Sequence, residues 1–298
     1  MLIALLVLLS VATLAYISAI THAANAQRVL PRLEGLLLGG VVSFFDALGI
    51  GSFASTTAWL KFRRLVPDRL IPPTLIVGLT PPALVQSVLF LILLGVMVDP
   101  VLLFGSAVAT LLGGLVGAPL VARARVWIVQ LLVAIALLLA ASAFAMSNLA
   151  MFPGGGTATG LPVGMTVVAI AASFGFGLLA NFGIGNYAPM LVMLSLMGMD
   201  PRLCFPIMAA GGSLMGVGAS VRHIRIAQID LKVVLGLALG GIPTAMVAVL
   251  VVKEMPLEML RWLVIVVVLY AAAVMLRAAF LGRREQDAEA ATAAVATP

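Results

Sequence analysis

An apolar segment broken by a Gly-x-Gly occurs twice in this chain and limits what the chain can fold into. Residues 33–64 read LEGLLLGGVVSFFDALGIGSFASTTAWLKFRR, and residues 174–198 read FGFGLLANFGIGNYAPMLVMLSLMG. The two Gly-Ile-Gly turns, at 49–51 and 183–185, stand 134 positions apart. Apolar segments interrupted at corresponding positions of two halves are typical of transporters built from two repeats, with the binding site at the breaks.

The composition places this pattern in a membrane. With 63% hydrophobic and 9% charged residues, the chain carries more apolar surface than one soluble core could bury. The alternating pattern of a β-barrel is absent, so we predict an all-α polytopic membrane protein. Seven apolar runs are long enough to cross about 30 Å of hydrocarbon: residues 2–20, 71–98, 101–121, 126–146, 203–220, 229–252 and 257–280.

The basic residues predict how the broken segments are arranged. The net charge of +6 comes from short Lys and Arg clusters between spans, which is typical of membrane topology and not of nucleic-acid binding. If each broken segment is a re-entrant hairpin, 33–48 with 52–62 and 165–180 with 186–197, 14 of the 17 basic residues share one side. Two single crossings would divide them 9 to 8. We therefore predict two hairpins, an N-terminus outside and a C-terminus in the cytoplasm, in the cell inner (cytoplasmic) membrane.

A hairpin plus three crossings gives each repeat an odd number of passes, so the predicted fold is two inverted repeats with one extra N-terminal helix. The predicted parts are an N-terminal transmembrane helix and linker at 1–32, repeat 1 at 33–146, an extracytoplasmic Gly-rich linker at 147–162, repeat 2 at 163–281, and a disordered cytoplasmic tail at 282–298.

Proline and glycine mark two features inside the spans. Pro81 and Pro82 must kink or break their helix, and the freed carbonyls near Gly78 and Thr80 are candidates for ligand contact. Small residues at four-residue spacing, such as Gly236-x-x-x-Gly240, are interpreted as helix-packing seams.

Asp46 is the acidic residue placed inside an apolar stretch. An intramembrane carboxylate costs at least a few kcal/mol and is by default a functional hypothesis. It lies near the C-terminal end of a half-helix, where the dipole favours the protonated form, so we predict a role in proton coupling. The alternative is that Asp46 caps the free N–H groups of residues 52–54 across the turn, and the two roles are compatible.

The second half-helix of each hairpin opens with short polar residues. Helix N-termini present unpaired N–H groups and a positive dipole end, which suit an anion where no Lys or Arg is near. Ordinary N-capping by Ser52 and Asn186 is the alternative. Thr56, Thr57, Gln86 and Ser87 are weaker candidates, since each could bond to its own helix backbone. The predicted substrate-binding residues are Gly49, Gly51, Ser52, Phe53, Thr80, Asn181, Gly183, Gly185, Asn186, Tyr187 and Ser213.

The hairpin motifs GGVVSFFDALGIGS and FGFGLLANFGIGN, with HIRIAQIDLK followed by LGLALGGIPTA, resemble the TauE/SafE (sulfite exporter, 4-toluene sulfonate uptake type) transporter family. The resemblance covers roughly residues 33–281. It implies a multi-pass inner-membrane carrier of sulfite, of sulfonates such as sulfoacetate, or of small carboxylates, driven by the proton gradient. Ser52 and Asn186 stand where members usually have a third Gly, and Asp46 lies outside the usual motif.

The function predicted from this resemblance is proton-coupled secondary transport of small organosulfur anions. A carrier of another organic anion, or an anion channel, is the alternative. An enzyme is not expected, because one intramembrane Asp, two His and one Cys offer no cluster of reactive groups. We expect no cofactor and no metal. The expected partners are a small anion, protons and membrane lipid, without nucleic acid, and a homodimer is left open.

The hairpin topology can be tested by cysteine labelling. After replacement of Cys204, single cysteines introduced at Ala26 and Val66 flank the first hairpin. A re-entrant segment returns to its side of entry, so both should react with a membrane-impermeant maleimide from the same side. Labelling from opposite sides would show that this segment crosses the membrane.

Overall fold

The computed structural model describes residues 2–27, 29–67, 70–121, 126–149, 156–180, 186–225 and 229–296. In these residues it contains α-helices, a 3-10 turn at Gly95–Met97 and no strand, which confirms the predicted all-α class. The helices are α1 (Leu2–Gln27), α2 (Leu33–Ala47), α3 (Phe53–Phe62), α4 (Ile71–Leu93), α5 (Pro100–Val121), α6 (Val126–Asn148), α7 (Val163–Ala180), α8 (Tyr187–Leu196), α9 (Pro201–Arg225), α10 (Leu231–Glu254) and α11 (Leu257–Ala296).

Seven helices of the described part are long and apolar enough to cross a membrane, as expected for a polytopic membrane protein. They are not all the predicted seven. The 18-residue α7, predicted as half of a hairpin, is counted among the seven because it reaches the length of a span. The predicted span at 126–146 is observed as the 23-residue α6. Eighteen apolar residues are enough for a short crossing. Whether α7 crosses the membrane or forms half of a hairpin therefore depends on the direction in which the chain continues into α8.

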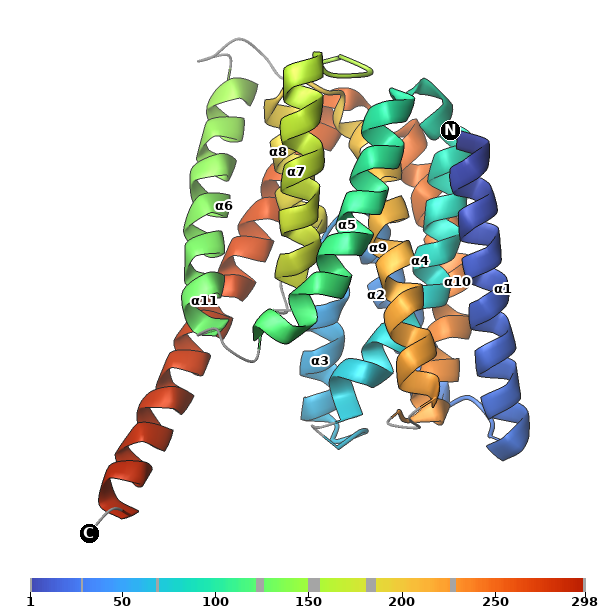
Figure 1. Cartoon of the computed structure of the whole chain (residues 1–298), viewed down its shortest axis with the longest axis vertical. Helices are drawn as coiled ribbons and strands as arrows, with labels where there is room; N and C mark the ends of the chain where they lie inside the picture. The colour runs from blue at the N-terminus through green and yellow to red at the C-terminus, as the bar shows by residue number, and fades with distance from the viewer. Residues whose placement is uncertain are drawn as a thin grey trace.

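Figure 1 shows where the two hairpins enter the bundle. The N-terminus lies at the upper end of the view and the C-terminus at the lower end. The α2–α3 hairpin enters from the lower end, and α7 and α8 enter from the upper end. Hairpins entering from opposite ends are what two inverted repeats require, although the relation between the repeats stays a prediction.

The two halves of the chain pack on each other reciprocally. The first helix of each hairpin lies against a long helix of the other half: α2 packs on α10, and α7 packs on α5. α4 packs on α9, and α6 packs on α11. Neither hairpin is therefore covered by its own half alone.

Glycines bring the backbones of α2 and α10 into contact. A Cβ added at Gly39 would overlap the backbone of Leu237, and one added at Gly240 would overlap the carbonyl of Leu36. The seam predicted from the spacing of Gly236 and Gly240 is thus occupied by α2.

α4 is continuous through Pro81 and Pro82, and the N-terminal helix supplies a partner for a carbonyl that Pro81 leaves free. Pro81 has no N–H for the carbonyl of Val77, one turn earlier. The Tyr16 hydroxyl of α1 donates to that carbonyl at 2.8 Å, and Tyr16 is buried. The Thr80 hydroxyl is likewise engaged, since it donates to the Ile76 carbonyl at 2.7 Å. The Val77 carbonyl is therefore occupied by α1, while the role expected for the carbonyls near Gly78 and Thr80 stays a prediction.

The C-terminal segment differs from the prediction. Residues 282–296, expected to be disordered, continue α11, which is 40 residues long. The mixed charge suggests a loose tail, but the segment is rich in Ala and Glu, which favour helix. Of the predicted Gly-rich linker, residues 150–155 lie outside the described part, and Ala158 pairs with Met199 at the end of the α8–α9 connection.

The α2–α10 contact predicts a difference between two glycine substitutions. Gly240→Ala places a methyl group against the α2 backbone, and overpacking of this kind costs about 1–3 kcal/mol. Gly164→Ala, in α7, meets nothing within 4 Å and improves helix propensity. Thermal unfolding in detergent should show a lower midpoint for Gly240→Ala and no decrease for Gly164→Ala. Equal midpoints would mean that the two helices are not in backbone contact.

Candidate functional site

The turn of the first hairpin depends on two glycines in the left-handed region. Gly49 has φ +96° and Gly51 has φ +83°, which residues with a Cβ adopt only at a cost. Two backbone hydrogen bonds end α2 at this turn: the N–H of Gly49 donates to the Asp46 carbonyl at 2.8 Å, and the N–H of Ile50 donates to the Phe45 carbonyl at 3.1 Å. The Gly-Ile-Gly sequence therefore reverses the chain within a few residues.

The Asp46 side chain caps the second half-helix. Its Oδ1 accepts the backbone N–H of Ser52 at 2.8 Å, immediately before α3. Neither the Ser52 side chain nor the Asn186 side chain caps its own helix. The structure thus contains the predicted Asp46 cap, which binds the N–H of Ser52, the first of residues 52–54. A proton-coupling role stays a prediction and is compatible with the cap.

The other carboxylate oxygen begins a polar chain to the second hairpin. Gln86 of α4 is fully buried, and its Nε2 lies 3.3 Å from Asp46 Oδ2 and 3.5 Å from the Ser43 carbonyl. The Oε1 of the same amide lies 3.5 Å from the Tyr187 hydroxyl of α8. Three of the predicted residues are therefore connected: Ser52 contacts Asp46, and Gln86 links Asp46 to Tyr187.

The second hairpin presents its polar residues to α9. Asn186 is buried, and its Nδ2 donates to the Met208 carbonyl at 3.5 Å. A Cβ added at Gly212 would lie 3.4 Å from the Tyr187 ring and 3.5 Å from Asn186 Oδ1. The backbone of α9 at Gly212 therefore lies beside both side chains. The predicted residues Asn181, Gly183 and Gly185 lie outside the described residues.

The tip of the first hairpin is set against the second half of the chain. Around Gly49, the nearest side chains are Leu191 of α8, Phe205 of α9 and Val267 of α11, all at 3.7–3.8 Å from a Cβ built there. The two hairpins therefore meet through apolar contacts at the turn and through Gln86 beside it.

Three predicted residues are not part of this polar chain. The Phe53 side chain is half-exposed. Thr80 is paired with Ser220 of α9 at 2.9 Å, and Ser213 donates to the carbonyl of Ala210 within its own helix. We therefore place these three outside the group around Asp46.

Sequence reasoning ranked Gln86 low and did not single out Ser43. Gln86 is the longest polar side chain in an otherwise apolar span, which was the available signal. Ser43 lies three residues before Asp46 and so on the same face of α2. Among the described residues, the hydroxyls of Ser43 and Ser87 are buried without a hydrogen-bond partner. The backbone carbonyl of Ser43 contacts Gln86, and Ser87 is the next residue after Gln86.

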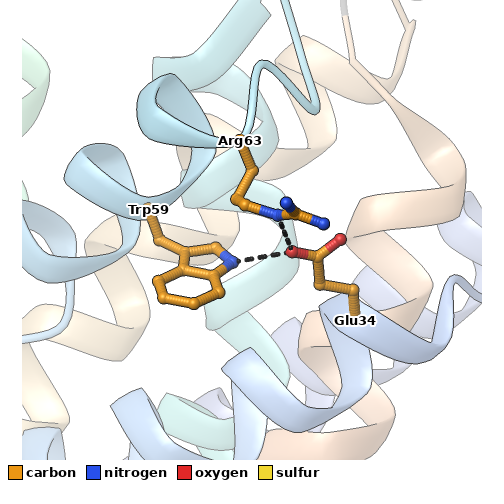
Figure 2. Close-up of polar contacts among 3 residues, drawn as sticks. All are labelled: Glu34, Trp59 and Arg63. Atoms are coloured by element: carbon orange, nitrogen blue, oxygen red, sulfur yellow. Dashed lines mark hydrogen bonds and ion pairs between the residues drawn. The ribbon is translucent and has the colours of Figure 1, made fainter.

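An ion pair joins the two helices of the first hairpin at the end opposite the Gly49–Gly51 turn. Figure 2 shows the Glu34 carboxylate facing both Trp59 and Arg63. Its Oε1 accepts from Arg63 Nε at 2.8 Å and from Trp59 Nε1 at 3.1 Å, which ties the first turn of α2 to the end of α3. The hydrogen bond from Arg63 holds the pKa of Glu34 below its ordinary value of 4.5. This end of the hairpin is thus fixed by a carboxylate that stays ionised.

Together, apolar helices long enough to span a membrane and two hairpins joined by a buried polar chain define a multi-pass membrane protein, with an arrangement typical of transporters. Residues 160–297 match the model of the family described as Sulfite exporter TauE/SafE, a family of membrane transporters. This match confirms the suspected family over α7 to α11, which include the second hairpin. The resemblance of residues 33–159, which include the first hairpin, stays a prediction. The search of curated proteins and the search of solved structures gave no match.

The Glu34 contact predicts a pH dependence of hairpin closure. Because the pKa of Glu34 is lowered in the folded protein, the contact is complete above the ordinary value of 4.5 and is lost as pH falls through the lower folded value. In a variant with Trp127→Phe and Trp262→Phe, the emission of Trp59 should change over this acidic range. Glu34→Gln keeps an acceptor oxygen but does not titrate, so its emission should stay constant. An acid transition that survives in Glu34→Gln would assign it to another group.

Proposed function

We propose that this protein is a secondary transporter of small organosulfur anions, sulfite or sulfonates such as sulfoacetate, coupled to the proton gradient. The observation that carries the proposal is the buried polar chain from the Ser52 N–H through Asp46 and Gln86 to Tyr187, which joins the two hairpins. The printed description of the matching family, a sulfite exporter, supports the class of substrate.

The site can attract an anion without a basic side chain. A helix N-terminus carries about half a positive charge and free N–H groups, and it stabilises an anion by roughly 1–2 kcal/mol in a partly buried setting. At α3 an oxyanion already accepts the first N–H, since Asp46 Oδ1 lies 2.8 Å from the nitrogen of Ser52. The same geometry suits a sulfite or sulfonate oxygen.

Asp46 supplies the proposed link to protons. An ionised Asp46 repels a second anion and occupies the N–H of Ser52, whereas a protonated Asp46 removes that charge. Proton binding and anion binding then favour each other, as cotransport in one direction requires.

The arrangement of the hairpins supports alternating access. They enter from opposite ends of the bundle (Figure 1), and the first helix of each is held by the other half of the chain. Inverted repeats that rock about a central site are one general solution to transport. We place the protein in the cell inner membrane with the lower end of Figure 1 in the cytoplasm, because the predicted topology collects 14 of the 17 Lys and Arg on the side of the C-terminus, which Figure 1 draws at that end.

A transport assay tests the substrate class. Purified protein in proteoliposomes should take up labelled sulfite or sulfoacetate faster under an imposed pH gradient than without one. A dicarboxylate under the same gradient serves as the comparison. Uptake of the dicarboxylate without uptake of either sulfur anion would overturn the proposed substrate.

Asp46→Asn tests the coupling. Asn retains an oxygen that can accept the Ser52 N–H, so the hairpin should fold and anion exchange should remain measurable. Stimulation by the pH gradient should be lost, because the side chain no longer titrates. Glu34→Gln is the matched control, since it makes the same change at the outer end of the same hairpin and should keep the stimulation. Parent-like stimulation in Asp46→Asn would leave Asp46 as a structural cap.

A further inference from the structure

The Gln86 amide lies between two groups of different hydrogen-bonding character, one from each hairpin. Its Nε2 is 3.3 Å from Asp46 Oδ2 of the first hairpin, and its Oε1 is 3.5 Å from the Tyr187 hydroxyl of the second. Gln86 is fully buried, so water does not offer the amide another set of partners. The direction of one end of the amide therefore determines the direction of the other.

An ionised Asp46 fixes the amide in the arrangement observed. A carboxylate only accepts hydrogen bonds, so Gln86 must direct its NH2 group towards Asp46. The carbonyl oxygen of the amide then faces Tyr187 and accepts from the hydroxyl. A tyrosine hydroxyl has one proton, and in this arrangement that proton is used within the protein.

Protonation of Asp46 reverses these roles. With a proton on Oδ2, the carboxyl group becomes a donor, and the Gln86 amide can accept it after a half-turn about its last side-chain torsion. Such a terminal torsion is broad and roughly two-fold, so the turn is inexpensive. The NH2 group then faces the Tyr187 oxygen, which accepts, and the hydroxyl proton is released to another acceptor. One proton has been added to Asp46, and no covalent bond of Gln86 or Tyr187 has changed.

The hydroxyl of Ser43 is a second indication that this region has two hydrogen-bond arrangements. The Ser43 carbonyl lies 3.5 Å from Gln86 Nε2 and is one of its acceptors. The hydroxyl of the same residue is buried and has no hydrogen-bond partner in the described part of the chain, although buried hydroxyls are rarely left so. Turning the amide removes the donor from the Ser43 carbonyl and brings an acceptor to the neighbourhood of this unused donor.

We propose that Gln86 is a positioning residue that transmits the protonation state of Asp46 to the Tyr187 hydroxyl by turning its amide. A proton bound on the first hairpin thus frees a hydrogen-bond donor at the start of α8 on the second. The proposal rests on the proposed function for the identity of the acceptor, a sulfur oxyanion, but the turn of the amide does not depend on which anion is carried.

The described elements packed around Asp46 present no charged side chain to it. α3 offers a backbone N–H, α4 offers the Gln86 amide, and α10 meets the same face of α2 with glycines and Thr244. The hairpin tip meets Leu191, Phe205 and Val267 of α8, α9 and α11, which are apolar. In the described part of the chain, Tyr187 is the titratable side chain that faces Asp46, through Gln86.

Infrared difference spectroscopy of the full chain in lipid nanodiscs tests the relay without any transported anion. The Asp46 carboxyl band is identified by its loss in Asp46→Asn, and the Tyr187 band by its loss in Tyr187→Phe, which is practical with three tyrosines in the chain. In the parent, the Tyr187 band should shift over the same pH interval as the Asp46 band.

The decisive variant is Gln86→Met, which keeps the length of the side chain without the amide, and Gln86→Leu is the second choice. Asp46 should still titrate in either variant, while the shift of the Tyr187 band should disappear. Ser173→Ala, which removes a buried hydroxyl bonded to its own helix in α7, should retain the coupled shift. A Tyr187 band that still follows Asp46 in both Gln86 variants, or one that never moves in the parent, overturns the proposal.

Sulfite uptake in proteoliposomes adds the functional readout. If Gln86 transmits the proton signal, stimulation by the pH gradient should fall from several-fold in the parent to near one in Gln86→Met, and Ser173→Ala should match the parent. Undiminished stimulation in Gln86→Met overturns a role of the relay in coupling. If the parent carries no sulfite, the proposed substrate fails, whereas the infrared result still decides the relay.

Discussion

Every backbone group freed by a break in an apolar helix bundle must find a partner inside the protein, because each unsatisfied group costs several kcal/mol in hydrocarbon. This chain interrupts its helices at the Gly49–Gly51 turn and loses a backbone hydrogen bond at Pro81 within the continuous α4, and it supplies a side-chain partner at each place. Asp46 receives the first N–H before α3, and Tyr16 donates to the carbonyl left by Pro81. The positions of α1, α3 and α4 all depend on these two hydrogen bonds.

The partner chosen at the first break has consequences beyond stability. A serine or asparagine cap would satisfy the same N–H as Asp46 does, but neither can gain or lose a proton near neutral pH. When a carboxylate caps the half-helix, the same group stabilises the turn and sets the charge of the site. The cap and the proposed proton carrier are thus two states of the same side chain, and no competition between the two interpretations arises.

Packing between the halves of the chain separates rigid contacts from adjustable ones. α2 meets α10, and α7 meets α5, through glycines that bring backbones together, and such seams have little freedom to rearrange. Around Gln86 the contacts are instead between side-chain hydrogen-bonding groups at 3.3–3.5 Å, with an unpartnered hydroxyl at Ser43. Rearranging the hydrogen bonds around Gln86 is therefore less costly than separating the backbones at these seams.

The sequence by itself determined the all-helical membrane class and the first hairpin to within a residue, since the predicted half-helices 33–48 and 52–62 are observed as Leu33–Ala47 and Phe53–Phe62. Glycines that adopt positive φ and apolar runs of set length act locally, so adjacent residues reveal them. Only the tertiary structure decided that Gln86 joins Asp46 to Tyr187 and that Tyr16 donates to the Val77 carbonyl of α4, because these partners stand 40, 101 and 61 positions apart. A single polar side chain in an apolar span does not indicate its partner, which is set by the helices that pack beside it.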